Sequence, residues 1–311
     1  MKNFYRQHSK AIWIFCIAIQ AFFLTTKSFS QNEPNWDWWA QNISQRNLPT
    51  DGRWRDYLII SPGFMGPNAL PVPEISKGRV NNELRLETGL QGHFSPGDKT
   101  YNTYMDLNLN LAKDRVSLLV YGYLAEHFAM DTLTRDKRML SGFYYNPEGW
   151  AVGDVYFGTE IQLWKAENSF ADVMLRMITR AASGGKEGAA RYTDTPGYYF
   201  DLSLGKTKTF EKMAMRTNFM LGFYVWQTNI LGQNDALLYG IGSDFIFEKF
   251  DISTSLDGYI GYIDDGDKPM LWRVEFNRKR EKIDYLVQYQ LGLIDNDYHA
   301  IKLSLIYHIS L

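Results

Sequence analysis

The sequence contains a single cysteine among its 311 residues, and this residue, Cys16, lies in an apolar stretch near the N-terminus. We expect that stretch to be removed on export, which leaves a mature chain without a thiol. Such a chain cannot form disulfide bonds, a cysteine metal site or a thiol nucleophile. Attachment of lipid to Cys16 is not expected, because no mature domain of the lipoprotein kind begins after it.

Long apolar runs are also missing after residue 30, where no stretch approaches the roughly 18 consecutive apolar residues of a membrane helix. Mean hydropathy is negative, yet aromatic residues make up 15% of the chain. A transmembrane β-barrel reconciles these observations. Half of its strand residues face lipid, the other half face a polar interior, and aromatic residues ring both interfaces.

Residues 1–30 have the three parts of a signal peptide. Lys2, Arg6 and Lys10 form a basic start, residues 11–24 form an apolar core, and Ser28-Phe29-Ser30 supplies the small residues that a signal peptidase prefers. We expect cleavage near Ser30. The alternative is an uncleaved anchor, for which the apolar run is short.

Charge argues against nucleic acid as a partner. The chain has 33 Lys and Arg residues against 35 Asp and Glu residues. The predicted signal peptide holds no acidic residue but several basic ones, so the mature chain is more acidic still. A chain with this excess of acidic residues is not expected to bind a polyanion such as nucleic acid.

Alternation of apolar and polar residues dominates the chain after Asn81, as in Met105-Asp106-Leu107-Asn108-Leu109. Successive side chains of a strand point to opposite faces, so these segments have one apolar and one polar face. The fold class expected is all-β, a transmembrane antiparallel up-and-down barrel of about 12 strands over residues 81–311. The predicted strands are 83–94, 101–112, 116–128, 150–164, 170–181, 197–206, 212–227, 236–248, 250–263, 269–278, 281–293 and 299–311. Strand 116–128 is apolar on both faces, which leaves its phase open.

Residues 31–80 lack this alternation and form a separate predicted segment. Pro62, Pro67, Pro71 and Pro73 exclude a central strand there. We predict an ordered segment that plugs the lumen or lies under the periplasmic mouth, with a short strand over residues 55–60 as an option. A flexible leader is the alternative.

The polar phase of the strands supplies the candidate site. A soluble β-sandwich or lipocalin-like barrel would direct its apolar phase inward and would not place acids and arginines on strand after strand. In a membrane barrel these charges line the lumen and should pair, because an isolated buried charge is costly. They would form either a solute-selecting constriction or a salt-bridge lattice that stiffens the barrel. The candidate residues are Asp154, Glu160, Asp172, Arg176, Arg180, Asp201 and Arg216.

Motifs for catalysis, cofactors or metals are weak. His308 and Ser310 share a phase, but their strand already explains them, and no Gly-x-Ser-x-Gly motif occurs. Asp264-Asp265-Gly266-Asp267 lacks the spacing of a calcium loop, and Ser183-Gly184-Gly185-Lys186 lacks the first glycine of a phosphate loop. We therefore predict no enzyme, no cofactor and no metal site.

A run of glycine and acidic landmarks resembles a known family. It comprises Gly153-Asp154-Val155-Tyr156-Phe157-Gly158, Gly197-Tyr198-Tyr199-Phe200-Asp201 and Leu238-Tyr239-Gly240-Ile241-Gly242. This part of the chain resembles the outer-membrane transporters associated with the meta pathway of phenol degradation. The resemblance implies a passive barrel without a cofactor, and it identifies no substrate.

The sequence as a whole predicts an integral protein of the bacterial outer membrane that acts as a passive channel or transporter for small solutes through a charged lumen. The alternative is a closed structural or adhesive barrel that binds a partner through extracellular loops, Tyr144-Tyr145 above all. Expected partners are outer-membrane lipid, a small solute and the barrel-assembly machinery. The last strand resembles the recognition signal of that machinery, although Leu311 stands where Phe is usual.

Overall fold

The computed structural model describes residues 58–138, 148–186, 189–228 and 232–309. The predicted signal peptide, its cleavage site, residues 31–57 and the Tyr144-Tyr145 loop lie outside these ranges. Leu58–Ile60, the described end of the optional short strand, is not a strand. The elements are β1 (Leu84–Ser95), β2 (Asp98–Ala112), β3 (Val116–Met130), α3 (Thr132–Lys137), β4 (Glu148–Ala151), β5 (Val155–Trp164), β6 (Asp172–Arg180), β7 (Gly197–Thr209), β8 (Ala214–Gln227), β9 (Gln233–Ile246), β10 (Phe250–Ile260), β11 (Met270–Arg278), β12 (Ile283–Ile294) and β13 (His299–Ile309).

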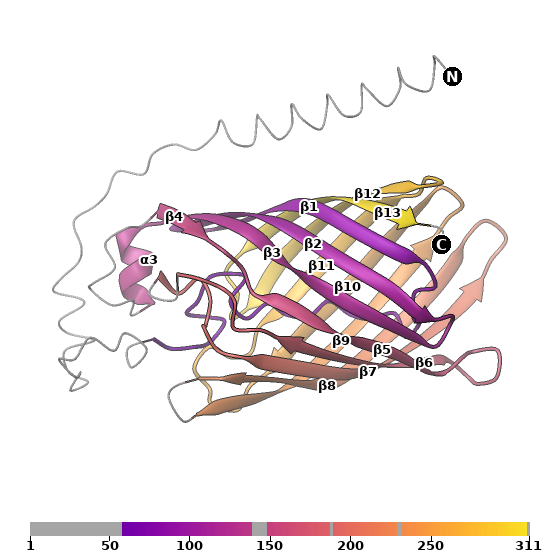
Figure 1. Ribbon diagram of the computed structural model, residues 1–311, viewed down its shortest axis with the longest axis horizontal. Coiled ribbons are helices and arrows are strands. Elements are labelled where there is room, and N and C mark those ends of the chain that lie inside the picture. Colours follow the sequence, from indigo (N-terminus) through magenta and orange to yellow (C-terminus); the bar gives the residue numbers. More distant parts are fainter. Residues whose placement is uncertain (1–57, 139–147, 187–188, 229–231, 310–311) are drawn as a thin grey trace, which may run out of the picture. The chain divides into compact units, whose positions relative to one another are not determined.

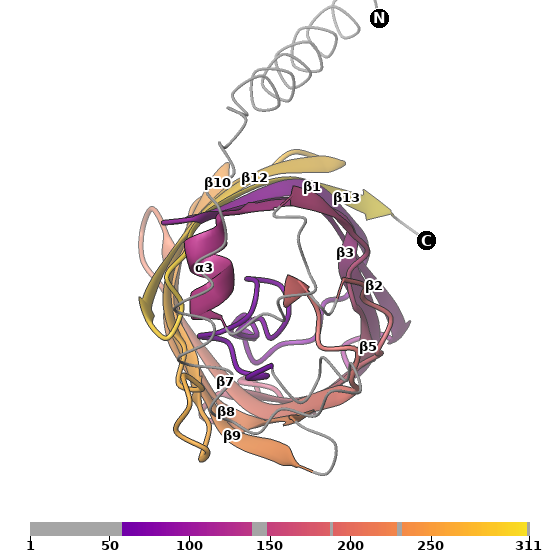
Figure 2. The same ribbon diagram turned by 90° about the vertical axis from the view of Figure 1, so that its left-hand side faces the viewer.

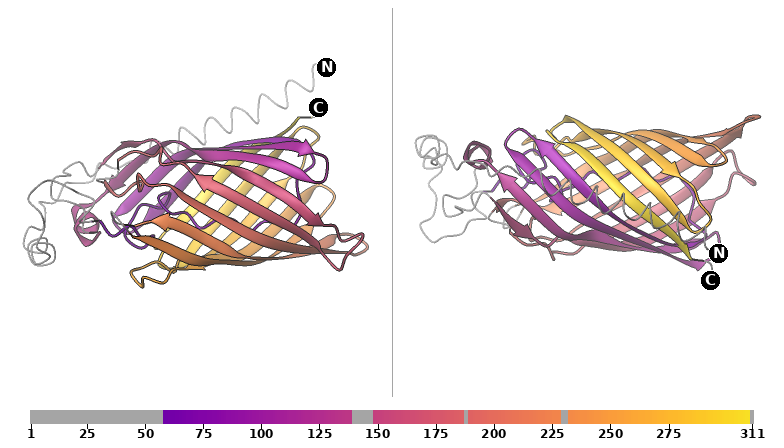
Figure 3. Two further views of the ribbon diagram at one scale, coloured as in Figure 1. Left: turned by 60° about the horizontal axis from the view of Figure 1, so that its bottom comes forward. Right: turned by 90° about the horizontal axis from the view of Figure 1, so that it is seen from above.

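The strands form one closed antiparallel barrel, tilted against its axis (Figures 1 and 3). Consecutive strands pair around the ring, and β1 pairs with β13 from Leu84↔Ile309 to Phe94↔His299 to close it. The predicted barrel of 12 strands is confirmed, with β4 as an additional short strand on β3. Several predicted strand ends differ from the observed ones by two or three residues, and one predicted strand is not continuous. Strand 150–164 is broken into β4 and β5, and between them the Gly153 amide donates a 2.9 Å hydrogen bond to the Tyr123 carbonyl.

The apolar phase of the strands faces outward. In β7, Tyr198, Phe200 and Leu202 are exposed by 39–48%, whereas Asp201 and Ser203, at alternate positions, are fully buried. β8 repeats the pattern, with Phe219, Leu221 and Phe223 exposed. A soluble barrel would have the opposite arrangement, so this surface is built to contact hydrocarbon.

A β-bulge explains why the phase of strand 116–128 was ambiguous. Thr103 pairs with Ala125 but Tyr104 pairs with Tyr123, so Leu124 has no partner in the ladder. An extra residue shifts the strand by one position and exchanges its faces. Ser117 and Leu119 are buried before the bulge, and Glu126 and Phe128 are buried after it. A single alternating phase therefore cannot describe this strand.

The two ends of the barrel differ in their connections. At one end, which we call the turn end, strands are joined by short connections such as residues 113–115, 247–249 and 279–282. At the opposite end, which we call the α3 end, the connections include the longest ones, between β3 and β5 and between β6 and β7. Within the described ranges no helix is both long and apolar enough to cross a membrane.

Candidate functional site

Residues 58–83, which we call the inner segment, lie inside the ring of strands (Figure 2). Leu58, Ile60, Met65, Leu70 and Val72 belong to its buried core and are each at most 4% exposed. The prolines of this segment explain its form. Because proline has no amide hydrogen, the segment cannot complete a strand ladder, and its carbonyl groups need other donors.

Those donors are side chains of the barrel wall, spread from one end of the segment to the other. Near the α3 end, Trp226 Nε1 donates to the Ile60 carbonyl at 3.0 Å. Midway, the Tyr259 hydroxyl donates to the Leu70 carbonyl at 2.8 Å. Towards the turn end, Gln162 Nε2 donates to the Gly78 carbonyl at 2.9 Å, while Gln162 Oε1 accepts from the Val80 amide at 2.9 Å. The wall therefore binds backbone groups of the inner segment as well as packing against the side chains of that segment.

Wall arginines repeat one arrangement along the segment. Each guanidinium faces an acid of the wall on one side and a carbonyl of the inner segment on the other. Because both partners accept hydrogen bonds, Arg176, Arg216 and Arg273 each satisfy two buried acceptors at once. Arg180 donates to the inner segment and faces Asp154 at ion-pair distance without a hydrogen bond. The contacts are Arg176 with Asp201 (2.7 Å) and Glu74 O (2.9 Å), Arg180 with Asp154 (3.9 Å) and Ala69 O (2.5 Å), Arg216 with Asp172 (2.9 Å) and Lys77 O (2.9 Å), and Arg273 with Asp257 (2.6 Å) and Val72 O (2.8 Å).

The structure therefore places six of the seven candidate residues in three acid–arginine pairs: Arg176 with Asp201, Arg180 with Asp154 and Arg216 with Asp172. The seventh, Glu160, forms no ion pair with an arginine of the described ranges and accepts a 2.9 Å hydrogen bond from the Ser117 hydroxyl. Together they do not form one ring across the lumen. The pairs hold the inner segment, and Glu160 and Arg176 also line a cavity beside it.

This lumenal cavity has a volume of about 390 Å³. It is lined by the inner segment and by residues of β1, β2, β3, β5, β6, β7, β11, β12 and β13. The inner segment itself is fastened mainly to β5, β6, β8, β10 and β11. Glu74 and Lys77 of the inner segment are half exposed, at 52% and 48% of the side chain, although they lie inside the barrel. The unfilled part of the lumen is therefore polar and wide enough for water.

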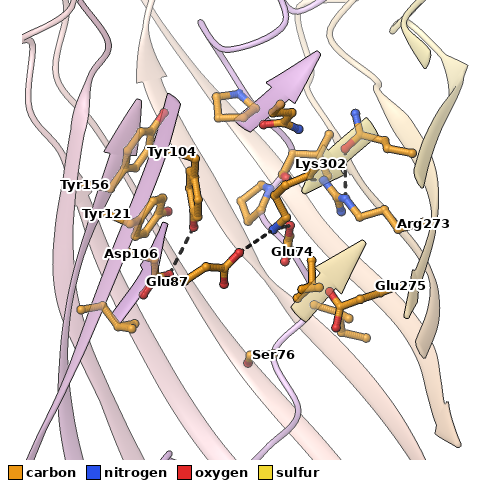
Figure 4. Close-up of a pocket in the computed structure, with 18 of the residues that line it drawn as sticks. Glu74, Ser76, Glu87, Tyr104, Asp106, Tyr121, Tyr156, Arg273, Glu275 and Lys302 are labelled. Atoms are coloured by element: carbon orange, nitrogen blue, oxygen red, sulfur yellow. Dashed lines mark hydrogen bonds and ion pairs between the residues drawn. The ribbon is translucent and has the colours of Figure 1, made fainter. Parts of the chain in front are cut away.

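Figure 4 shows the charged centre of the cavity. Lys302 Nζ reaches from β13 to Glu74 at 3.3 Å and to Glu87 at 3.4 Å. Facing it, the Tyr104 hydroxyl donates to Asp106 at 3.2 Å. Lys302, Asp106 and Tyr104 are absent from our candidate residues. Alternation could have found them, since Lys302 stands between outward Ile301 and Leu303, and Asp106 between Met105 and Leu107.

A buried ionic cluster lies at the α3 end of the lumen. Arg191 donates to Glu126 at 2.7 Å and to Asp98 at 2.8 Å, and Asp98 also accepts from Arg138 at 2.6 Å and from the Tyr298 hydroxyl at 2.6 Å. The cluster joins the inner segment as well, because Asn68 Nδ2 donates to Glu126 at 2.6 Å. We call Asp98, Glu126, Arg138, Arg191 and Tyr298 the outer cluster.

Two tyrosines of the connections at this end remain protonated. Burial, and after it the charge of Glu126, raises the pKa of Tyr192 well above its usual range. Burial likewise raises the pKa of Tyr298, with Arg138 opposing and Asp98 reinforcing the shift. Both hydroxyls therefore act as hydrogen-bond donors to carboxylates, at 2.9 Å for Tyr192 and Glu126. The connections between β6 and β7 and between β12 and β13 are thereby tied across the lumen.

Metal ligands are not grouped in this lumen. Among the described residues, no group of three or more His, Cys, Asp or Glu side chains is arranged to hold a metal ion. His308 contacts Glu83 at 2.8 Å and Asp284 at 3.1 Å near the turn end, which joins the ends of β1, β12 and β13.

Comparison with solved structures identifies barrels of the same kind. An outer-membrane channel from Pseudomonas putida F1 matches with a TM-score of 0.53 at 13% identity, over 76% of this chain and 100% of that one. The KdgM porin matches with a TM-score of 0.44 at 8% identity, over 72% of this chain and 99% of that one. The likeness to the Pseudomonas putida channel shows the fold, that of an outer-membrane β-barrel.

No family model and no curated protein sequence matches the chain. Membership of the transporter family of the phenol meta pathway, and the absence of catalysis, therefore stay predictions.

Proposed function

We propose that this chain is an integral β-barrel of the bacterial outer membrane that lets small solutes pass through the part of its lumen that the inner segment leaves free. The observation that carries the proposal is the lumenal cavity of about 390 Å³ with half-exposed charged side chains. A barrel of purely structural purpose would gain stability by filling such a space with packed side chains.

The orientation is inferred from the connections. Outer-membrane barrels have short periplasmic turns and longer extracellular loops. The turn end would then face the periplasm and the outer cluster would face outward. In this arrangement the cavity reaches Asn81 and Asn277 near the periplasmic side and Asn296 in the β12–β13 connection at the opposite end.

The adhesive alternative has less support. Its central residues, Tyr144-Tyr145, lie outside the described ranges. A lumen filled by the N-terminal segment would have favoured it, but the described part of that segment leaves the cavity beside it. We therefore keep the channel as the proposed function.

Planar-bilayer recording of the purified full-length protein, together with liposome swelling, tests the proposal. We expect a small conductance that falls in the variant Asn277→Trp, because Asn277 lines the cavity on β11 and a larger ring would narrow it. Arg278→Trp is the matched control, since Arg278 is the next residue on the same strand and points to the other face. Absence of both conductance and solute flux would refute the channel.

A further inference from the structure

The basic and the acidic side chains of the lumenal cavity differ in how they are paired. Its lysine and arginine side chains all have acidic partners. Examples are Arg85 with Glu87 at 3.1 Å, Arg79 with Asp172 at 3.0 Å and Lys77 with Asp244 at 2.9 Å. Lys302, Arg176 and Arg273 are paired as described above. An anionic solute would therefore find each cation already neutralised.

Three carboxylates of the cavity, in contrast, accept hydrogen bonds only from neutral side chains among the described residues, although Arg85, Arg176 and Lys77 lie near enough to act on them electrostatically. Asp106 accepts from Tyr104 at 3.2 Å, Glu160 from Ser117 at 2.9 Å and Glu275 from Gln288 at 3.3 Å. None of the three forms an ion pair within the described part of the chain. Arg176 lies opposite Glu160 in the ladder, but its guanidinium is directed to Asp201 and to the Glu74 carbonyl.

Beside these carboxylates lies an acceptor without a donor. Asn108 is 6% exposed and lines the cavity two residues after Asp106. Within the described part of the chain, neither Asn108 Oδ1 nor Asp106 Oδ1 has a hydrogen-bond partner. A buried acceptor left unpaired costs free energy. A ligand that brings N–H groups would satisfy both acceptors.

The wall next to the carboxylates is made of tyrosine rings. Tyr121 and Tyr156 stack at a centroid distance of 4.8 Å, and the Tyr121 hydroxyl meets that of Tyr199 at 2.7 Å. Faces of aromatic rings attract cations. The protein already uses this property here, since Lys302 Nζ lies 5.2 Å from the centre of the Tyr104 ring and the Arg176 guanidinium 5.1 Å from that of Tyr199.

We propose that the lumenal cavity is a binding site for a small organic cation that carries N–H donors, that is, a primary ammonium or a guanidinium with a short apolar part. The charged group would be held by the carboxylates Asp106, Glu160 and Glu275 that line the cavity, and the apolar part would lie against the tyrosine wall. Figure 4 shows Asp106 next to Tyr104 and Tyr121, and Glu275 on the facing side of the cavity. A cavity of about 390 Å³ falls in the range of small-molecule sites. As a statement about which solutes pass through the lumen, this proposal rests on the proposed channel function. As a statement about a binding site, it is tested by itself.

Titration calorimetry of the detergent-solubilised full-length protein tests the site directly, with benzylammonium as the probe and benzoate as the anionic comparison. We expect benzylammonium to bind and benzoate not to bind. Asp106→Asn should weaken binding roughly tenfold or more, because a charge-assisted hydrogen bond is worth about 1.5–3 kcal/mol. Glu275→Gln provides a second variant in case Asp106→Asn fails to fold. Glu211→Gln, in the exposed turn after β7, is the control and should bind as the wild type does.

The possible outcomes separate the two proposals. Binding that depends on Asp106 or Glu275, without any conductance or flux, would keep the site and refute the channel. Conductance with no benzylammonium binding, or with binding that Asp106→Asn and Glu275→Gln leave unchanged, would keep the channel and refute the site. Tighter binding of benzoate than of benzylammonium would also refute it.

Discussion

Arg273 of β11 holds the inner segment through Val72. Its Nη2 donates to the Val72 carbonyl at 2.8 Å, while its Nη1 donates to Asp257 on the neighbouring strand at 2.6 Å. The two residues are 201 positions apart in the chain. Because the wall acid fixes the guanidinium, the carbonyl of the segment is bound to a rigid part of the barrel. Arg176, Arg180 and Arg216 bind the inner segment in a similar way, so side chains of the barrel wall fix the position of the segment.

We predict that Arg273→Lys loosens the inner segment. A lysine retains a positive charge for Asp257 but cannot donate to both partners in the same forked geometry. The lost bond to Val72 weakens one attachment by about 1.5–3 kcal/mol, so we expect a larger and noisier conductance in planar bilayers. Arg278→Lys on the same strand is the control. The idea is wrong if Arg273→Lys conducts as the wild type does and the double variant with Arg216→Lys does the same.

We predict that Arg191 of the outer cluster matters more for stability than any exposed arginine. It is fully buried between Asp98 and Glu126, so Arg191→Met leaves two buried carboxylates with less compensation. Breaking such a network typically costs about 3–5 kcal/mol. Urea unfolding in detergent micelles measures this loss, and Arg278→Met should shift the midpoint little. A double variant Arg191→Met/Glu126→Gln should recover part of the loss, because it removes one of the unpaired charges.

The close contact of Gly66 with Arg191 gives a coupled prediction. A Cβ atom at Gly66 would lie 2.7 Å from Arg191 Cζ, so Gly66→Ala must displace the guanidinium. We expect a destabilisation of about 1–3 kcal/mol, as for other overpacked sites. The effect should shrink in the Arg191→Met background, because the shorter charge-free side chain can yield. Additive effects in the double-mutant cycle would contradict this contact.

The barrel could be predicted from the sequence because its physical cause is local. Leu202 faces outward and its neighbour Asp201 faces the lumen. Because side chains alternate between the two faces of a strand, this difference produces a period of two residues in the sequence. The prediction failed where a local period is interrupted. At Leu124 a bulge exchanges the faces. At Gly153 the strand breaks where the backbone packs so closely on Tyr123 that an added Cβ atom would lie 2.4 Å from its carbonyl oxygen.

The site could be predicted only in part, because its contacts are not local. Alternation indicates that Arg180 faces the lumen, but not that it binds the Ala69 carbonyl 111 residues earlier in the chain. Nor does it indicate which carboxylates remain unpaired. Glu160 stands opposite Arg176 in the ladder, and only the inner segment and Asp201 together draw the guanidinium away. The choice of partner by Arg176 depends on contacts between segments that are far apart in the sequence, which alternation within one strand does not record.

Asp154 lies in the connection between β4 and β5 and is fully buried. Burial raises the pKa of Asp154 above its usual 3.8, and the nearby Arg180 and the amides of Gly184 and Ser183 only partly oppose the shift. Because the folded protein then holds this proton more tightly than the unfolded chain, stability falls as the pH rises through the interval above 3.8. The loss is complete once the pH exceeds the folded pKa.

Asp154→Asn should remove this dependence, because asparagine resembles the protonated acid and keeps an oxygen that accepts from the Gly184 amide, now at 2.7 Å. We expect the variant to unfold at a higher urea concentration than the wild type at pH 7, with the difference shrinking towards pH 4. Asp264→Asn, at an exposed position, serves as the control. If Asp154→Asn is instead less stable at pH 7, the carboxylate stabilises the fold through Arg180, and the 3.9 Å separation of these groups contributes more than burial costs.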